Sequence, residues 1–487
     1  MNSFNISDSN KSWDDELLAD SKSSQIIEKV EITMATKELA KRAVPAFFGT
    51  VFKHMIDITN IFFSGKISSF SKNMQIFSES DIIAGVGLGL LSYNALIFSV
   101  SWGMSSTIDT LASQAFGNKK YHLCGYYLNR YRVVSSVVFI FQLLLLYYIG
   151  DLLEMIGQPE EASRICQTFI RYQLVGLYCS VQFEGLRRYL IAQGVYNVIV
   201  YIQAACFCLH ISILDGLHYN SLLTVESLAF ANLVTNVMSL ILLTIFCMKT
   251  TKIHREAWHY SLGSFEGLKE FIRYAIPSTL MRSLEYWVCE ILMIFSGWCG
   301  SKQQAAAITA WNIYSAFYRF TSGISMATSN LVGNCLGNND PRNGKQYAIA
   351  SMLVTCIPII FTMSFLYFLR YQIMSFSGDQ TVIEIGAKLF LILMIINPTD
   401  FLQSSLFGVM VAMGYQKYGS LINIFSYFLF LIPLAYILGI TYNYGVIGIF
   451  SAWIFGSILC TGLVASCVFL TDWHKLALKI QSRLSES

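Results

Sequence analysis

Charged residues are scarce in this sequence: Asp, Glu, Lys and Arg make up 13% of its 487 residues, against roughly 25% in soluble domains. Hydrophobic residues make up 54%, and the mean hydropathy is +0.52. So little charge excludes an ordinary soluble domain, and the net charge of +3 gives no reason to expect a nucleic-acid partner. The composition predicts a polytopic membrane protein with the lipid bilayer as its partner.

The usual signatures of enzymes and metal sites are also absent. The sequence has no Gly-rich phosphate loop and no His-Glu-x-x-His helix, and its twelve cysteines are scattered without a Cys-x-x-Cys. The two deep histidines, His54 and His210, sit in no catalytic pattern. We therefore expect no enzyme, no catalytic residue, no metal and no cofactor. Because no ATP-binding cassette is present, the energy for any transport must come from an ion gradient.

Apolar runs of about 20 residues, the length that crosses a ~30 Å hydrocarbon layer, recur along the chain. They lack the alternation of lipid-facing barrel strands, so the expected fold class is all-α with about twelve transmembrane helices. The expected spans are 40–64, 82–108, 128–149, 168–191, 197–215, 226–248, 271–297, 304–332, 347–369, 385–411, 418–439 and 445–470.

Lys and Arg are concentrated in one of the two alternating sets of loops, for example at 119–120, 187–188 and 249–255. The positive-inside rule makes that set cytosolic and places both termini in the cytosol. No signal peptide is visible in the acidic first forty residues. The expected location is the plasma membrane or a vacuolar or vesicular membrane.

Two carboxylates, Glu285 and Glu290, lie inside the span 271–297. Burying an ionised carboxylate at that depth is costly, so a use is expected for it, and proton-coupled transport is the natural one. Five residues at ~100° each put the two acids about 140° apart around the helix, so a straight helix cannot aim both into one pocket. Arg282 lies one turn from Glu285, which predicts either an ion pair or a site for a cationic substrate.

The chain contains an internal repeat. Segments 103–118 and 323–338 share Gly, Ser, Leu, Gly and Asn at a constant offset, and 37–45 matches 269–277 at a larger one. The same constant offset pairs the ends of the fourth and tenth spans, where Gly194 matches Gly414. Six spans separate the copies, so the halves have parallel topology and form two lobes related by a pseudo-two-fold axis along the membrane normal, with a cleft between them.

This repeat predicts the division of the chain. The expected parts are a disordered cytosolic tail at 1–36, an N-lobe at 37–250, a cytosolic linker at 251–266, a C-lobe at 267–470 and a cytosolic tail at 471–487.

Four motifs resemble signatures of the MATE (multidrug and toxic compound extrusion) transporters, in their eukaryotic branch. They are IDTLASQAFG at 108–117, LEYWVCE at 284–290, NLVGNCLG at 330–337 and DFLQSSLFG at 400–408. The chain departs from the family at Ala112 and Ser113, which replace a usual Cys-Gly. The resemblance implies a monomeric two-lobed antiporter that exports small molecules, organic cations or other xenobiotics, in exchange for protons.

Two alternatives stay open beside proton antiport. Carboxylates and carbonyls serve Na⁺ as well as H⁺, which leaves a sodium-coupled antiporter. A flippase of the same superfamily, carrying lipid-linked sugars, would need a cleft rich in Arg and Lys for phosphate. The charges expected at the midplane are mainly acidic, which favours the antiporter.

The resemblance also implies which acids carry protons. Glu290 is the first candidate, Asp400 on the tenth span is expected to share its proton, and Glu285 is the third. Structural alternatives are a hydrogen bond to a neighbouring helix for Glu290, the Arg282 pair for Glu285 and a helix cap for Asp400. Pro398, just before Asp400, is expected to break its helix and provide a hinge.

The remaining candidates are contacts to the substrate or between the lobes. Aromatic rings beside a cationic substrate attract it through their faces, although packing is the alternative for each ring. The expected substrate contacts are Glu285, Tyr286, Trp287, Asn312, Tyr314 and Tyr318 in the C-lobe and Asp57 and Asn60 in the N-lobe. Asp109 and Gln114, near the cytosolic end, are expected to act in gating or lobe contact.

Overall fold

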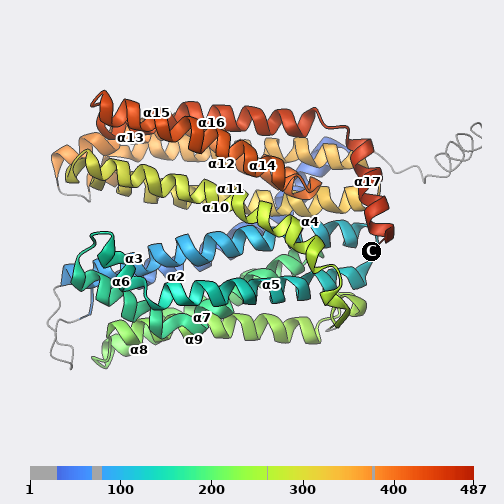
Figure 1. The fold of residues 1–487 in the computed structure, drawn as a ribbon, viewed down its shortest axis with the longest axis horizontal. Coiled ribbons are helices and arrows are strands. Elements are labelled where there is room, and N and C mark those ends of the chain that lie inside the picture. The colour runs from blue at the N-terminus through green and yellow to red at the C-terminus, as the bar shows by residue number, and fades with distance from the viewer. Residues whose placement is uncertain (1–29, 68–78, 260–261, 376–378, 487) are drawn as a thin grey trace, which may run out of the picture.

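The computed structural model describes residues 30–67, 79–259, 262–375 and 379–486, and within these ranges the chain forms helices and no strand (Figure 1). The helices before the linker are α2 (Ile32–Ser64), α3 (Glu79–Tyr93), η1 (Asn94–Phe98), α4 (Ser99–Gly117), α5 (Tyr121–Tyr147), α6 (Ile149–Met155), α7 (Glu160–Ala192), α8 (Asn197–Tyr219) and α9 (Val225–Lys249). Short helices η2 (Arg255–Ala257) and η3 (Leu262–Phe265) lie in the linker.

The second half has the same plan. Its helices are α10 (Leu268–Trp298), α11 (Ser301–Gly337), α12 (Pro341–Met374), α13 (Gln380–Met413), the continuous stretch α14 (Gln416–Asn423), η5 (Ile424–Leu431), α15 (Ile432–Tyr436) and η6 (Ile437–Thr441), then α16 (Gly445–Phe469) and α17 (Trp473–Glu486). Each expected span coincides with one of these helical stretches, most of which extend further at one or both ends.

The ends of the sequence-based division differ in part from the structure. α2 begins at Ile32, inside the tail expected at 1–36, and residues 1–29 of that tail lie outside the described residues. The tail expected at 471–487 contains the helix α17.

Eight helical stretches in the described ranges are long and apolar enough to cross a membrane by length and composition. Four further long helices, α2, α7, α10 and α11, carry charged residues within their length, such as Glu184, Glu285 and Arg319. Charges in a membrane helix face the protein interior or a water-filled cavity. These four helices are therefore expected to line the functional part of the molecule.

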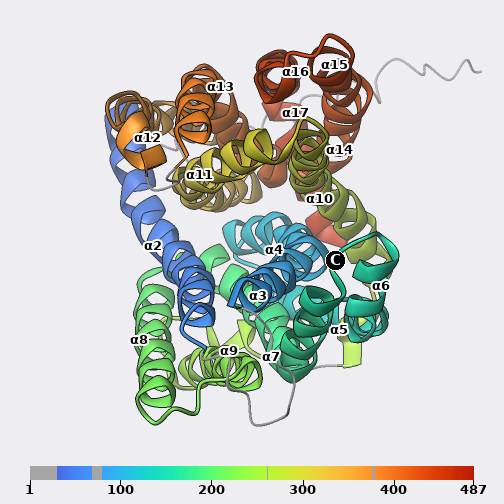
Figure 2. The ribbon, with the colours of Figure 1, turned by 90° about the vertical axis from the view of Figure 1, so that its left-hand side faces the viewer.

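The helices form two lobes that lie side by side, as Figures 1 and 2 show. Equivalent glycines end equivalent helices in the two lobes: Gly194 follows α7 with φ +78°, and Gly414 follows α13 with φ +76°. Left-handed backbone of this kind favours glycine and stops a helix. The repeat read from the sequence is therefore also a repeat of local geometry.

The first helix of each repeat crosses from one lobe to the other. At its start α2 contacts the C-lobe, where Arg42 Nη1 donates to Asn330 Oδ1 at 2.8 Å, and further along it packs on α8, where Asn60 Oδ1 lies 3.1 Å from His210 Nε2. Its equivalent, α10, begins against α5 of the N-lobe. Each helix contains a proline near its crossing, Pro45 in α2 and Pro277 in α10.

At one end of the molecule the backbones of α4 and α11 touch through glycines. A Cβ added to Gly117 would collide with the backbone of Asn334, and a Cβ added to Gly337 would collide with the backbone of Gln114. These pairs are equivalent under the sequence repeat, so the contact is reciprocal across the pseudo-two-fold axis. We call this end, where the lobes meet, the closed end.

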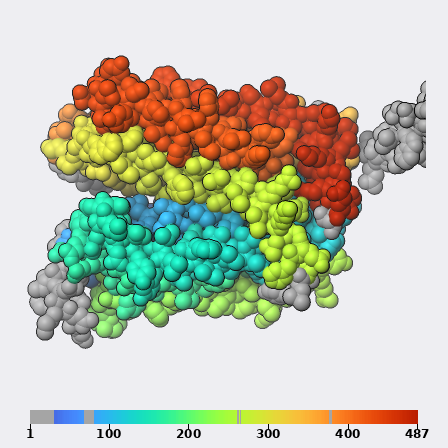
Figure 3. Space-filling model, in the orientation of Figure 1, coloured from blue at the N-terminus to red at the C-terminus, as the bar shows by residue number. Residues whose placement is uncertain are grey.

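The C-terminal helix α17 bridges the same end. Arg483 Nη2 donates to Gln114 Oε1 at 2.6 Å on the N-lobe side, and Gln481 Nε2 donates to the Gly337 carbonyl at 2.6 Å on the C-lobe side. Gln481 also accepts from Asn118 Nδ2 at 2.6 Å. Figure 3 shows the lobes meeting near α17, with a furrow between them toward the opposite end.

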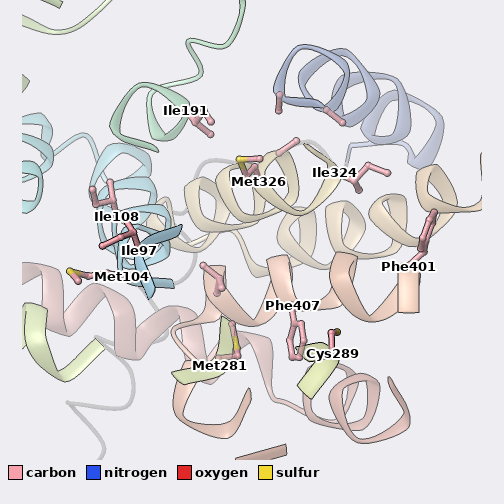
Figure 4. Close-up of a cluster of buried hydrophobic side chains, with 14 of the residues drawn as sticks. Ile97, Met104, Ile108, Ile191, Met281, Cys289, Ile324, Met326, Phe401 and Phe407 are labelled. Atoms are coloured by element: carbon pink, nitrogen blue, oxygen red, sulfur yellow. The ribbon is translucent and has the colours of Figure 1, made fainter. Parts of the chain in front are cut away.

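Buried apolar side chains connect the two lobes. Figure 4 shows Met104 of α4, Met281 of α10, Met326 of α11 and Phe407 of α13, all at most 4% exposed. They belong to one cluster of buried residues that includes helices of both lobes. The apolar core therefore continues from one lobe into the other.

We predict that Gly337→Ala lowers the unfolding temperature of the purified protein. Its added methyl group meets the α4 backbone, and overpacking of this kind costs roughly 1–3 kcal/mol. Gly462→Ala in α16 is the matched control, because its added Cβ meets nothing within 4 Å and alanine is favoured in a helix by roughly 0.5–1 kcal/mol. Thermal unfolding of both variants in one detergent checks this; equal unfolding temperatures would contradict the close contact.

Candidate functional site

A cavity lies between the lobes. Its walls come from η1 and α4 of the N-lobe and from α10, α11, α13, η5 and α16 of the C-lobe. Aromatic rings form much of the surface: Trp102, Tyr286, Trp311, Tyr318, Tyr427 and Trp453. We call this space the C-side cavity.

Glu285 faces the C-side cavity and is held by two partners. The Tyr318 hydroxyl donates to Glu285 Oε1 at 2.6 Å, and Arg282 Nη1 lies 3.4 Å from Glu285 Oε2. Arg282 also donates to Ser325 Oγ at 3.2 Å, and its guanidinium lies 5.1 Å from the Trp102 ring centroid. Glu285 therefore both pairs with Arg282 and lines a cavity that a substrate can enter, so the two alternatives considered for it are compatible.

Asp400 is the second carboxylate of the C-side cavity. The Tyr314 hydroxyl donates to Asp400 Oδ2 at 3.1 Å, and Tyr314 itself is fully buried behind the cavity wall. Glu285 and Asp400 line the same cavity. The structure thus brings together Glu285, Asp400, Tyr314 and Tyr318, four of the residues singled out from the sequence.

The break expected at Pro398 is absent, because α13 runs without interruption from Gln380 to Met413. Hydroxyl groups next to the proline satisfy backbone carbonyls there. Thr399 Oγ1 donates to the Ile396 carbonyl at 2.8 Å, and Thr461 Oγ1 of α16 donates to the Thr399 carbonyl at 2.9 Å. Proline is tolerated within membrane helices, and Pro398 lies inside one here.

Three other C-lobe candidates lie outside the C-side cavity. Glu290 lies beside the Tyr286 side chain and does not line the cavity. We expected Glu290 to lie with Asp400, but the carboxylate that shares the cavity with Asp400 is Glu285. Trp287 is 38% exposed and its indole nitrogen donates to the Ala95 carbonyl at 3.4 Å. Asn312 is exposed on α11.

The N-lobe candidates Asp57 and Asn60 of α2 have different neighbours. Asp57 lines a second cavity, which we call the N-side cavity, together with Lys53, His54 and Arg319. Asn60 is fully buried and bonds His210 of α8. Asp57 is therefore placed to meet a ligand, whereas Asn60 joins two helices.

Asp109 and Gln114 both take part in contacts near the closed end. Asp109 forms an ion pair with Arg188, which also lies 3.0 Å from Glu184. Glu184 is in turn 2.6 Å from Arg187, and all four side chains are almost fully buried. Gln114 Nε2 donates to the Ala412 carbonyl of the C-lobe at 2.6 Å, which makes it a lobe contact.

Among the basic residues of the cleft, sequence reasoning named Arg282 but missed Lys53 and Arg319, and it placed Arg187 in a cytosolic loop although Arg187 is buried within α7. Lys53, Arg187, Arg282 and Arg319 line the two cavities beside Asp57, Glu285 and Asp400, so the expectation of a mainly acidic midplane is wrong. The signal was available, because Lys53 and Arg319 are charged residues inside the spans 40–64 and 304–332. The rule that singled out Glu285 and Glu290 applies equally to them.

Comparison with known proteins identifies a class of two-lobed membrane transporters. The MatE family model matches residues 74–215 and 277–437, more than half of the chain. The chain therefore belongs to the MatE family, the MATE transporters, which confirms the resemblance carried by the four motifs.

Its relatives include plant proteins. Protein DETOXIFICATION 37 of Arabidopsis thaliana is 26% identical over 463 residues, covering 92% of this chain and 88% of that protein. Protein DETOXIFICATION 14 of the same plant is 26% identical over 472 residues, covering 96% and 95%. These matches extend over nearly the whole of both chains.

Solved structures share the fold. The crystal structure of the eukaryotic MATE transporter AtDTX14 superimposes with a TM-score of 0.86 at 24% identity, covering 93% of this chain and 99% of that one. The Vibrio cholerae MATE transporter VcmN in its bent form gives a TM-score of 0.76 at 14% identity, covering 92% and 98%. The all-helical fold in two lobes predicted from the sequence is confirmed.

We predict that Asp109→Asn strongly destabilises the protein. It leaves an unbalanced positive charge in the buried cluster with Arg188, and breaking a buried ion pair costs roughly 3–5 kcal/mol. The control is Glu160→Gln, whose partner Arg164 is exposed, because an exposed pair contributes only about 0–1 kcal/mol. Unfolding temperatures of the two variants in detergent check this, and similar small losses would mean that the Asp109 pair is not needed for stability.

Proposed function

We propose that this protein is a secondary active antiporter that exports small organic molecules in exchange for protons by alternating access. Membership of a transporter family gives the class, and the names of its DETOXIFICATION relatives fit export. The observation that carries the proposal is the pair of carboxylates, Glu285 and Asp400, in one aromatic cavity between the lobes. The energy source is the ion gradient.

Competition between a proton and a cationic substrate for the same negative charge supports exchange. Tyr318 and Tyr314 fix the two carboxylates at the cavity, and a cationic group bound between them is stabilised by their charge and by aromatic ring faces. Protons that arrive neutralise the carboxylates and weaken that attraction.

The direction of export follows if the closed end is cytosolic. The start of α2 and the helix α17 both lie at this end. The Val30 backbone N–H, just before α2, donates to Asn343 Oδ1 at 2.9 Å, and Arg483 of α17 donates to Gln114. The distribution of Lys and Arg in the loops, judged by the positive-inside rule, supports a cytosolic location for both chain ends. In this orientation the furrow faces away from the cytosol, as required of the state that releases substrate and accepts protons.

The lining of the cleft favours a small organic substrate over a lipid-linked sugar. Aromatic rings line both cavities, and the C-side cavity adds the carboxylates of Glu285 and Asp400. Apolar and aromatic walls with a few placed polar groups are typical of small-molecule sites. The basic residues of the N-side cavity nevertheless make a lipid-linked phosphate the second candidate substrate.

We predict that proteoliposomes with an imposed pH gradient transport rhodamine 123, a fluorescent organic cation, and that Asp400→Asn reduces this flux by roughly tenfold or more. A hydrogen bond to a charged group contributes about 1.5–3 kcal/mol, which corresponds to this factor. Glu285→Gln is expected to act similarly. Glu290→Gln is expected to lose less, since its carboxylate lies outside the C-side cavity.

Glu384→Gln is the matched control, because Glu384 is an exposed acid on the same helix as Asp400. A Na⁺ gradient at constant pH forms the other arm. Flux driven by Na⁺ and not by H⁺ would replace the proton with sodium. Undiminished proton-driven flux in folded Asp400→Asn would contradict the assigned carboxylates.

A further inference from the structure

The two lobes present charges of opposite sign at equivalent positions of the repeat. Glu285 lies eight residues after Pro277 in α10, and Lys53 lies eight residues after Pro45 in α2. Because α2 and α10 are the equivalent first helices, the two side chains have the same place in their lobes. Glu285 lines the C-side cavity, and Lys53 lines the N-side cavity.

The surroundings of these two charges are also equivalent. The offset that pairs Gly117 with Gly337 pairs Phe98 with Tyr318, and Ser180 of α7 with Asp400 of α13. In the N-lobe, Lys53 Nζ donates to Ser180 Oγ at 3.3 Å and lies 5.2 Å from the centroid of the Phe98 ring. The acidic residue Glu285 of the C-lobe thus has a basic counterpart, Lys53, at the equivalent position of the N-lobe.

Arg319 adds a second positive charge at the junction of the two cavities. It lines both of them, and its Cζ lies 5.7 Å from the centroid of the same Phe98 ring that Lys53 approaches. Within the described ranges neither Lys53 nor Arg319 forms an ion pair. Both interact electrostatically with Asp57, the acid in the wall of the N-side cavity.

Lys53 and Arg319 are not held in ion pairs in the described ranges, unlike their neighbours. Arg187 is compensated by Glu184 at 2.6 Å, and Asp57 Oδ2 lies 3.9 Å from His54 Nδ1. Over the two joined cavities the acids and bases are equal in number, because Arg282 pairs with Glu285 and Asp400 shares the C-side cavity with Arg319. Lys53 and Arg319 nevertheless meet beside one ring, that of Phe98, where a bound anion can contact both.

We propose that Lys53 and Arg319 bind an anionic group, such as a carboxylate, of the transported molecule. The two cavities share Phe98, Trp102, Arg319 and Ser322, so one ligand can reach both. The cleft then suits a dipolar substrate, whose anionic end lies at Lys53 and Arg319 and whose cationic end lies at Glu285 and Asp400. The assignment of the cationic end rests on the proposed function.

A matched pair of dyes tests this subsite. Rhodamine 110 carries a free carboxylate, and rhodamine 123 is its methyl ester, so the two differ only in the anionic group. Binding is measured by fluorescence anisotropy with the full chain in detergent, and flux in proteoliposomes under a pH gradient. We expect Lys53→Gln and Arg319→Gln to weaken rhodamine 110 binding by roughly tenfold or more and rhodamine 123 binding by much less.

Two further variants separate charge from structure. Lys53→Arg and Arg319→Lys keep the positive charge and are expected to restore most of the rhodamine 110 binding. Lys41→Gln, an exposed cation on the same helix as Lys53, is the matched control and should leave both dyes unaffected. Unfolding temperatures of all variants report on their folding.

The outcomes distinguish the subsite from the proposed function. If folded Lys53→Gln and Arg319→Gln lose binding of both dyes equally, the anionic subsite is overturned and cation export stands. The same conclusion follows if the wild-type protein binds and transports rhodamine 123 but not rhodamine 110. Wild-type flux of rhodamine 110 alone, lost in these variants, would support the subsite and overturn the cationic preference. Binding of neither dye by folded wild type would overturn both.

Discussion

The close approach of α4 and α11 at the closed end is the constraint on which the rest of the molecule depends. Gly117 faces the backbone of Asn334, and Gly337 faces the backbone of Gln114, so two helices of different lobes touch where any side chain would separate them. The lobes are joined at this end, and the furrow between them lies toward the other. α17 covers the joint and adds hydrogen bonds to both sides of it.

Much of this fold could be predicted because its signals are periodic or local. Apolar length marks the spans, and the repeat of glycine and proline positions, such as Gly194 with Gly414, reveals two lobes before any contact is known. The starts of α2 and α10 are the exception. Each packs across the lobe boundary, and that exchange depends on contacts such as Arg42 with Asn330, which lie far apart in the sequence.

The candidate site was harder to predict, because helix rotation decides which face of a helix meets the cleft. Spacing alone showed that Glu285 and Glu290 must point apart, but packing of α10 on its neighbours selects Glu285 for the C-side cavity. The same holds for aromatic residues: Trp287 points away, whereas Trp102 and Trp453 form walls. Arg319 required no packing information and was visible as a charge within an apolar span.

The repeat supplies a symmetric frame, and the chemistry lies where the symmetry is broken. Glycines at equivalent positions keep the two halves alike at the closed end. Deeper in the cleft, Lys53 stands opposite Glu285, Phe98 opposite Tyr318 and Ser180 opposite Asp400, each pair at equivalent positions. A symmetric cleft would offer both ends of a ligand the same partners. The difference at these three pairs instead gives the cleft an electrical direction, which is the property that the proposed dipolar substrate requires, while the glycine contacts of the closed end stay alike in both halves.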